Sequence, residues 1–402
     1  MPVERRHAHS QKGSTQVKKI KARRLGVGTA VTVVTLTLLP AVSAHADAAP
    51  QAGDVVGVGS DLIQYALDFG ADGSTNAAGY NSAGNVNRLV SFDATADSNG
   101  RSGYLNGSTF SSQLPLNPTI VLRAGTNPVL RPNGGTTGVA AFLADTAGEI
   151  NFVRSPRQPT SAEQTTATSH NWGGIHVVQI GTDNLQIATA PTTHAPAGLS
   201  VAELVGIYNG TYKHWNELPG NAAGSTNAII PLIPQNGAAV RTLFTNDLKV
   251  ANGGTAVTLV TGIINVEQND PSVIAGQSSP ADAIVPLPVG RIALYSSAYF
   301  NDPSKAYGTP QTTLASNVKL LTAAAGDGAG SYNGVAPYYI WFRQTDAVST
   351  TPWQPGSVKN WVQTLFSSST GTPYFKGPIG QSLIADAGAT PSYVDLGISS
   401  VG

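Results

Sequence analysis

Residues 54–67 read DVVGVGSDLIQYAL, and this stretch decides the fold. Residues 55–58 are an apolar run with the length of a buried strand, and the glycines at its end permit a tight turn. Ser60 or Asp61 then caps a helix whose apolar face is Leu62, Ile63, Tyr65, Ala66 and Leu67. This order puts backbone N–H groups and a hydroxyl at the positive end of a helix, which suits an anion. The stretch predicts an α/β fold, although the same junction also occurs in α/β proteins where it binds nothing.

The first 48 residues have the order of an export signal. An apolar stretch, residues 25–39, follows a basic leader and precedes small residues that end in Ala-x-Ala-like sites at Ala44 and Ala48. Because the apolar stretch is short for a membrane span, we expect cleavage after Ala44 or Ala48, with an uncleaved anchor as the alternative. Two consecutive arginines before the apolar stretch leave both the general and the twin-arginine export routes open.

Removing this leader changes the charge balance. The leader holds eight of the 23 basic and two of the 23 acidic residues, which leaves 15 against 21, a net charge of about −6. Such a chain has no basic surface for nucleic acid. Because the sequence has no cysteine, disulfides, thiolate metal sites, a catalytic thiol and a lipid-carrying cysteine behind the signal are excluded. We expect a secreted protein, free or associated with the cell wall, and the length favours two lobes.

A second turn of the same kind occurs at residues 133–143, NGGTTGVAAFL. Its glycines and the hydroxyls of Thr136 and Thr137 precede an apolar helix start, which again suits an oxyanion. The alternative is that these residues only cap the helix.

A third candidate is residues 150–157, INFVRSPR, where a short apolar strand ends in Arg154, Ser155 and Arg157. Ligands gather at such strand ends in open α/β sheets, and arginine offers a planar fork for phosphate or carboxylate. Two arginines three residues apart on a strand cannot point the same way, so we expect at most one of them to enter a pocket. A solvated loop is the alternative.

Several other elements are expected downstream. Residues 175–180 and 185–190 read as two strands separated by a hairpin or crossover signal, GTDN. Ser200 with Glu203 forms a capping box at the start of a helix. Residues 291–299 read as a strand.

The order of these motifs resembles the phosphate-binding component of bacterial phosphate uptake systems, a family of two-lobed periplasmic substrate-binding proteins. The helix that begins after Ser200 ends in Ile-Tyr-x-Gly and is followed by Trp-Asn, as in that family. The other matching motifs are the opening turn Gly57-Val58-Gly59-Ser60 with Asp61 and Gln64 (typical of actinobacterial members), the turn at 133–138, Arg154-Ser155-Pro156-Arg157, the loop at 237–241 followed by Phe244, and the segment 265–291 with Asp270. The resemblance covers the mature chain nearly end to end.

The resemblance implies a type II periplasmic-binding-protein fold, α/β, in which each lobe is a mixed sheet flanked by helices and the ligand cleft lies between the lobes. Residues 49–189 and 301–402 would form lobe I and residues 190–300 lobe II, with closure by hinge motion. The implied function is capture of a small anionic or polar ligand, phosphate or a phosphate-like oxyanion, for an ABC permease. The chain would act as a monomer, without catalysis, cofactor, metal, nucleic acid or membrane insertion after signal cleavage.

The resemblance also carries over a ligand-binding set drawn from turns that lie far apart in the sequence. Arg241 would supply the largest share of the binding. The set consists of Gly59, Ser60, Asp61, Thr136, Thr137, Ser155, Arg157, Gly237 and Arg241.

Four positions depart from the family pattern. Ala238 and Val240 stand where relatives place a serine and a threonine, and Gly135 replaces the serine of the second turn. Pro156 stands where relatives have the carboxylate that accepts the proton of protonated phosphate. Losing two or three charge-assisted hydrogen bonds at about 1.5–3 kcal/mol each is large beside the roughly 8 kcal/mol of a micromolar site. The identity and affinity of the ligand therefore stay open, and a larger or more weakly held ligand fits the sequence.

Two other classes of function compete with this one. Ser60 does not lie in the Gly-x-Ser-x-Gly elbow of α/β-hydrolases, and the histidines show no metal-ligand spacing. A serine hydrolase whose triad assembles only in space stays open, because triads are recognised by geometry. The Gly, Ser, Thr and Asn content together with the four departures also fits a non-transport, adhesin-like surface protein with a degenerate pocket.

Overall fold

The apolar run of residues 55–58 is a strand, β1 (Val55–Gly59), and all five of its residues are buried. All described residues belong to one compact unit, and no helix among them is long and apolar enough to cross a membrane. The predicted export signal and Asn133 of the second turn lie outside the described residues. The computed structural model describes residues 49–74, 76–94, 119–132, 134–296 and 318–401.

β1 belongs to a ten-stranded mixed sheet with the order β2-β1-β5-β11-β6-β9-β7-β8, and β10 and β12 also pair with β6. β1 is parallel to both of its neighbours, whereas β11 and β6 form antiparallel pairs. β3 and β4 form a separate two-stranded sheet. The strands after β1 are β2 (Leu89–Ser91), β3 (Thr119–Ile120), β4 (Val129–Leu130), β5 (Phe152–Ser155), β6 (Ile175–Thr189), β7 (Ile230–Pro234), β8 (Ile264–Val266), β9 (Ala283–Pro288), β10 (Lys319–Leu320), β11 (Gly334–Arg343) and β12 (Thr390–Ile398).

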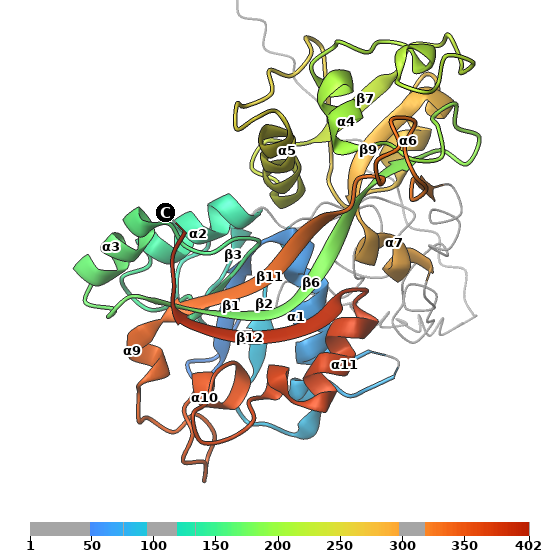
Figure 1. Ribbon diagram of the computed structural model, residues 1–402. Helices are drawn as coiled ribbons and strands as arrows, with labels where there is room; N and C mark the ends of the chain where they lie inside the picture. Colours follow the sequence, from blue (N-terminus) through green and yellow to red (C-terminus); the bar gives the residue numbers. More distant parts are fainter. Residues whose placement is uncertain (1–48, 75, 95–118, 133, 297–317, 402) are drawn as a thin grey trace, which may run out of the picture. The chain divides into compact units, whose positions relative to one another are not determined.

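The long strands β6 and β11 run side by side and join the two ends of the sheet (Figure 1). Residues 175–185 of β6 pair with β11, and residues 185–189 pair with β9. The hairpin or crossover predicted at residues 181–184 is therefore wrong. These residues stay extended because β11 offers a paired residue to each of them, so the glycine and the polar side chains lie within a continuous strand.

Apolar cores cover both faces of the sheet around β1. Val55 belongs to a core that contains Phe69 of α1, whereas Val56 and Val58 belong to a second core with Phe142 of α2. Burial on both faces explains why β1 reads as an unbroken apolar run. The helices are η1 (Asp61–Ile63), α1 (Gln64–Asp72), η2 (Tyr80–Ala83), α2 (Gly135–Ala144), α3 (Ser161–Ser169), α4 (Val201–Tyr208), η4 (Trp215–Glu217), α5 (Ala239–Ala251), α6 (Ser272–Ala275), η5 (Pro280–Asp282), α7 (Val289–Ser296), α9 (Gln344–Ala347), α10 (Trp361–Leu365), η8 (Tyr374–Lys376) and α11 (Pro378–Asp386).

The β9-β7-β8 part of the sheet is layered in the same way. Phe244 of α5 packs with α4 in one core, and Ile274 of α6 packs with Leu232 in another. α4 begins with the predicted capping box, which is confirmed: the N–H of Glu203 donates to Ser200 Oγ at 3.1 Å, and the N–H of Ser200 donates to Glu203 Oε2 at 2.9 Å.

The strand predicted at residues 291–299 is wrong, because its described part lies in the helix α7. Pro288 ends β9, and the chain turns into a helix directly after it. Arg291 and Leu294, three residues apart, are both buried, and this spacing puts them on one face of a helix.

A buried arginine holds the turn after β1. Arg154 of β5 is completely buried. Its guanidinium donates to the carbonyls of Ser60 at 3.0 Å, Gly59 at 3.1 Å and Phe92 at 2.7 Å, and to the hydroxyl of Ser91. Arg154 is therefore the buried one of the two arginines predicted near this strand end. Its side chain fixes the backbone of the Gly59–Ser60 turn.

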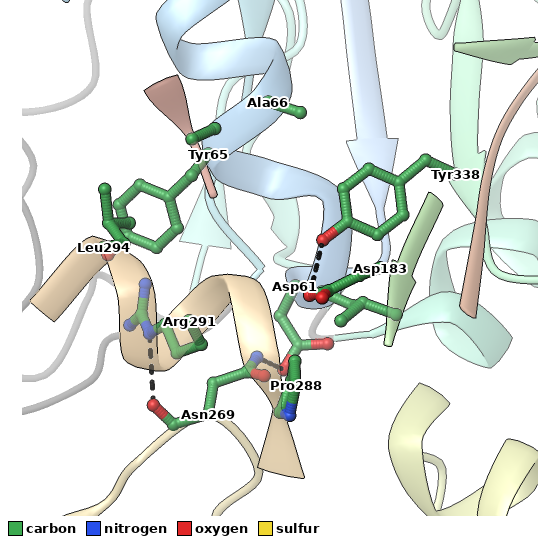
Figure 2. A pocket seen from close by; sticks show the side chains of 11 residues that line it. Asp61, Tyr65, Ala66, Asp183, Asn269, Pro288, Arg291, Leu294 and Tyr338 are labelled. Carbon is green, nitrogen blue, oxygen red and sulfur yellow. Dashed lines mark hydrogen bonds between the residues drawn. The ribbon is translucent and has the colours of Figure 1, made fainter. Parts of the chain in front are cut away.

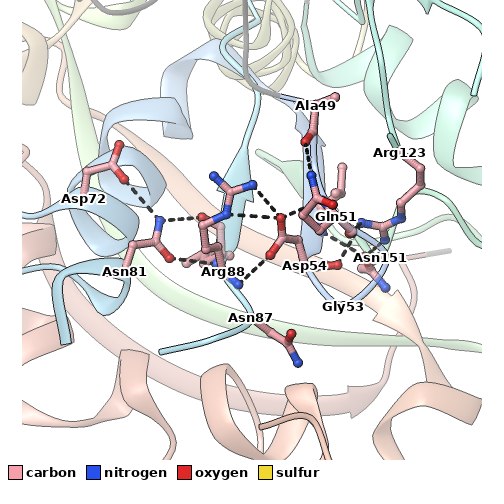
Figure 3. A network of polar contacts seen from close by, with 12 residues as sticks. Ala49, Gln51, Gly53, Asp54, Asp72, Asn81, Asn87, Arg88, Arg123 and Asn151 are labelled. Carbon is pink, nitrogen blue, oxygen red and sulfur yellow. Dashed lines mark hydrogen bonds and ion pairs between the residues drawn. The ribbon is translucent and has the colours of Figure 1, made fainter. Parts of the chain in front are cut away.

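A second polar network fixes the other end of β1 (Figure 3). The buried carboxylate of Asp54 accepts hydrogen bonds from the N–H groups of Gln51 and Arg88, both at 2.8 Å, and from the Arg88 guanidinium at 2.7 and 3.2 Å. Burial alone would raise the pKa of Asp54, but the bonds from Arg88 and Gln51 outweigh it and hold the pKa below its ordinary value. The start of β1 is thereby tied to β2.

We expect Arg154→Met to lower the free energy of unfolding by at least about 3 kcal/mol, because three buried carbonyls lose their donor. Arg157→Met, which removes the partly exposed arginine three residues later, should cost about 1 kcal/mol or less. Urea denaturation followed by circular dichroism measures both. Equal losses in the two variants would show that Arg154 does not hold the turn.

We expect Asp54→Asn to lower the free energy of unfolding by about 1–3 kcal/mol at pH 7. Because the pKa of Asp54 is depressed in the folded protein, its contribution is complete above the unfolded value of 3.8 and disappears as the pH falls through the folded value. The difference between wild type and variant should therefore vanish toward pH 2. Denaturation curves at a series of pH values test this, and a difference that is independent of pH would contradict it.

Candidate functional site

Glycines set the position of α2 against the end of β1. Gly59 has a φ of +118°, a region that favours glycine. A Cβ on Gly138 of α2 would overlap the Cα of Gly59, so the helix and the strand end touch backbone to backbone. A Cβ on Gly135 would lie 3.8 Å from the Cβ of Ser60. The first turn of α2 therefore begins beside the Ser60 turn.

A cavity of about 60 Å³ opens where α2 and α5 begin. One part of its wall comes from α2 and the end of β5, and the other comes from the start of α5. A Cβ on Gly134 would lie 3.3 Å from the carbonyl oxygen of Gly237, which shows how closely the two parts approach. The lining residues are Gly135, Thr136, Ser155, Pro156, Arg157, Gly237, Ala239, Thr242, Leu243 and Asn246.

Both helices present the positive ends of their dipoles to this cavity. The first N–H groups of a helix have no partner within the helix, and a capping side chain normally satisfies one of them. The residues before α2 and α5 are Gly134 and Ala238, and neither provides a side-chain cap. Two helices of ten and 13 residues thus start at the same cavity without a cap from the side chain of the preceding residue, which is an arrangement that suits an anion.

The structure brings together four of the nine predicted ligand-binding residues. Thr136, Ser155, Arg157 and Gly237 line the cavity. The hydroxyl of Ser155 donates to the carbonyl of Arg157 at 2.8 Å, so as a donor it is engaged in the loop itself. Gly59 lies behind this wall, where it packs against α2.

The guanidinium of Arg157 is already paired. Its two terminal nitrogens lie 2.7 Å from the two carboxylate oxygens of Glu163, and one of them also donates to the carbonyl of Gln158 at 2.9 Å. The bonds from Arg157 to Glu163 help to keep the pKa of that carboxyl low against the effect of burial. Arg157 therefore brings little net charge to the cavity.

Arg241 and Thr137 do not line the cavity, although they lie next to residues that do. Arg241 lies two residues after Ala239, which places it about 200° around α5 from the cavity-facing side. Its guanidinium donates to the carbonyl of Pro234 at 2.9 Å and to Asn265 Oδ1 at 2.6 Å. The sequence predicts that Arg241 meets Ser60 and Ser155 in one cleft. In the structure Ser155 lines the cavity, whereas Arg241 does not.

The departures from the family pattern have structural counterparts. Ala238 and Val240 are both buried, and Val240 packs in the core with Phe244. The backbone N–H of Val240 donates to Gln268 Oε1 at 2.9 Å, so this side chain occupies one amide at the start of α5. Hydroxyls at positions 238 and 240 are thus replaced by apolar packing and by a cap that comes from elsewhere in the chain.

Buried polar atoms without partners gather close to the same turn. Among the described residues, Ser60 Oγ, Asp61 Oδ1 and Glu267 Oε1 are buried and have no hydrogen-bond partner. Such atoms cost free energy unless a water or ligand satisfies them. Burial raises the pKa of Asp61, and the Gln268 amide opposes this. Sequence reasoning missed Glu267 and Gln268, since a glutamate and a glutamine in a loop carry no motif of their own.

A second pocket is lined by Asp61 (Figure 2). Asn269 donates to Asp61 Oδ2 at 3.2 Å, and its carbonyl accepts from Arg291 Nε at 3.1 Å. The hydroxyl of Tyr338 donates to Asp183 at 3.2 Å, and burial raises the pKa of Asp183 to about 6. This pocket joins β6, β11 and the segment after β8 through polar side chains.

No group of three or more histidine, aspartate or glutamate side chains within the described part of the chain is placed to hold a metal ion. The polar groups at the cavity are backbone amides, hydroxyls, an amide side chain and one paired guanidinium. This set can bind an oxyanion through hydrogen bonds and helix dipoles.

We expect Glu267→Gln to make the protein more stable relative to wild type as the pH rises. Burial and the charge of Asp61 raise the pKa of Glu267 to about 8. The folded protein therefore keeps a proton that the unfolded chain loses, and wild-type stability falls between about pH 4.5 and pH 8. Thermal melts from pH 4 to pH 9 measure this. Wild type and variant should have the same melting temperature at the acid end, and the melting temperature of the variant should exceed that of wild type by a growing amount as the pH rises.

Glu217→Gln is the matched control for this experiment. The hydrogen bond with His214 holds the pKa of the exposed Glu217 at about 2, so this variant should be less stable than wild type at neutral pH. At neutral pH we expect Glu267→Gln to be more stable than wild type and Glu217→Gln to be less stable than wild type. A Glu267→Gln variant without any pH-dependent gain would show that Glu267 ionises normally.

Comparison with known proteins places the chain in a family. The sequence profile of the PBP superfamily domain matches residues 94–369, which is more than half of the chain. No curated protein sequence matches this chain.

Solved structures with a similar fold have low sequence identity. A candidate phosphate ABC transporter substrate-binding protein from Clostridium perfringens with bound phosphate is 12% identical, with a TM-score of 0.49 over 84% of this chain and 99% of that one. An ABC-type phosphate transport receptor from Vibrio cholerae is 13% identical, with a TM-score of 0.47 over 84% and 100%. A human phosphate-binding apolipoprotein is 15% identical, with a TM-score of 0.46 over 84% and 91%.

The chain belongs to the PBP superfamily of two-lobed α/β substrate-binding proteins.

Proposed function

We propose that this protein is a secreted binding protein that captures a small anion, phosphate or a phosphate-like oxyanion, and delivers it to an ABC permease. The observation that carries the proposal is the cavity at which α2 and α5 both begin. The first helix follows the β1 half of the sheet and the second follows β7, so an anion between them would hold the two halves together. The names of the similar solved proteins, several of which bind phosphate, agree with this proposal.

The geometry favours a site that depends on dipoles and hydrogen bonds more than on ion pairs. Arg157 is paired with Glu163, and Arg241 is bonded to Pro234 and Asn265. Each helix end contributes about 0.3–1 kcal/mol, and up to about 2 kcal/mol when partly buried. We therefore propose moderate affinity, with Thr136 and the amides at the starts of α2 and α5 as the contacts.

We further propose that residues 49–189 and 301–402 form lobe I and residues 190–300 form lobe II. β6 ends at Thr189, which supports the first crossing. The protein would act as a monomer without catalysis, with its signal removed after Ala44 or Ala48. Hinge motion at the crossings would open the cavity to ligand.

Thr136→Asp tests the anion site directly. Thr136 is exposed on the second residue of α2, where a carboxylate suits the helix dipole and should not destabilise the fold. The same carboxylate lines the cavity and should repel an anion. Wild type at a hundredfold excess of phosphate over Kd should gain ~2.7 kcal/mol of stability, visible as a rise in melting temperature of several degrees, and the variant should gain none.

Thr137→Asp is the matched control. Thr137 is the exposed neighbour on the same helix turn, but it does not line the cavity, so this variant should keep most of the phosphate response. Equal responses in both variants would place the anion elsewhere. The absence of any wild-type response to phosphate, sulfate or a phosphonate would refute the proposed function.

A further inference from the structure

The cavity extends along α5 well beyond the start of the helix. Ala239, Thr242, Leu243 and Asn246 face it, and this i, i+3, i+4, i+7 spacing is one continuous stripe of a helix. Seven residues of helix span about 10 Å. A tetrahedral oxyanion at the helix start would cover only the first part of that length.

The two ends of the cavity differ in chemistry. The groups suited to an oxyanion lie at one end, around Gly135, Thr136 and the amide of Gly237. At the other end α5 presents Leu243, which packs against the core, and the exposed side chain of Asn246. This end offers an apolar wall and an amide in place of further helix termini.

The charge of the lining limits what could occupy the second end. Arg157 is the one charged side chain among the described residues that line the cavity, and both of its terminal nitrogens are bonded to Glu163. A second anionic group would therefore find no cation with spare charge. A cation would find no carboxylate in the lining to bind it.

The cavity has room for several non-hydrogen atoms. Its volume of about 60 Å³ corresponds to roughly four water-sized positions at about 15 Å³ each.

We propose that the ligand is an organic oxyanion, a phosphonate or phosphate monoester whose tetrahedral head lies at the starts of α2 and α5 and whose short uncharged arm lies along Leu243 and Asn246. This inference rests on the proposed function, since it takes the head site as given. It adds the class of substrate: the arm is recognised by an apolar wall and a side-chain amide.

Ethylphosphonate and inorganic phosphate are the probes that test this. Calorimetric titration of wild type should give a Kd for ethylphosphonate about tenfold lower than for phosphate, because the arm buries two additional carbon atoms. Asn246→Trp fills the arm end from an exposed position and should remove this preference, so that the ratio of the two Kd values falls to about one. Asn252→Trp, an equally exposed asparagine just after α5, is the control and should keep the preference.

Each outcome decides between the two proposals. If wild type binds phosphate as tightly as ethylphosphonate, or more tightly, the proposal of an organic ligand is wrong. The proposed anion site is not affected by that result. The same holds if Asn246→Trp weakens both ligands equally, because the side chain would then reach the head site. If neither anion binds wild type, both proposals fail.

Discussion

The buried guanidinium of Arg154 is the interaction on which the rest of this structure depends. It joins the carbonyls of Gly59, Ser60 and Phe92, which lie in separate segments that meet at the end of β1. Carbonyls at the end of a parallel strand have no ladder partner, and a completely buried donor fork satisfies several of them at once. The turn beside the proposed anion site is therefore held from inside the protein.

The position of this turn then determines where α2 can lie. Gly138 touches Gly59 without any intervening side chain, so the helix axis comes as close to the strand end as backbone atoms allow. The start of α2 is consequently brought beside Ser60 and faces the start of α5 across the cavity. Packing of glycine against glycine, more than any charged side chain, brings the positive end of the α2 dipole to the proposed site.

The local features of the site could be predicted from the sequence, but its long-range pairings could not. The strand and helix of residues 54–67 and the glycine turn before α2 follow from periodicity and turn chemistry, which act over a few residues. The partner of Arg157 is a helix residue six positions on, and the side of α5 on which Arg241 lies depends on where that helix packs. The run GTDN failed as a turn signal because β11 pairs with it, although it lies about 150 residues away.

The acidic groups near the turn explain why a site built on dipoles is consistent with this chain. Asp61 and Glu267 lie close enough for the charge of Asp61 to raise the pKa of Glu267, so acidic side chains gather near the turn at the end of β1. A guanidinium placed there would pair with these carboxylates before any ligand arrived, as Arg157 pairs with Glu163. Backbone amides at helix ends cannot be neutralised in this way, because their dipoles are fixed by the helix. They therefore keep their attraction for an oxyanion in an acidic neighbourhood where an arginine side chain would lose it.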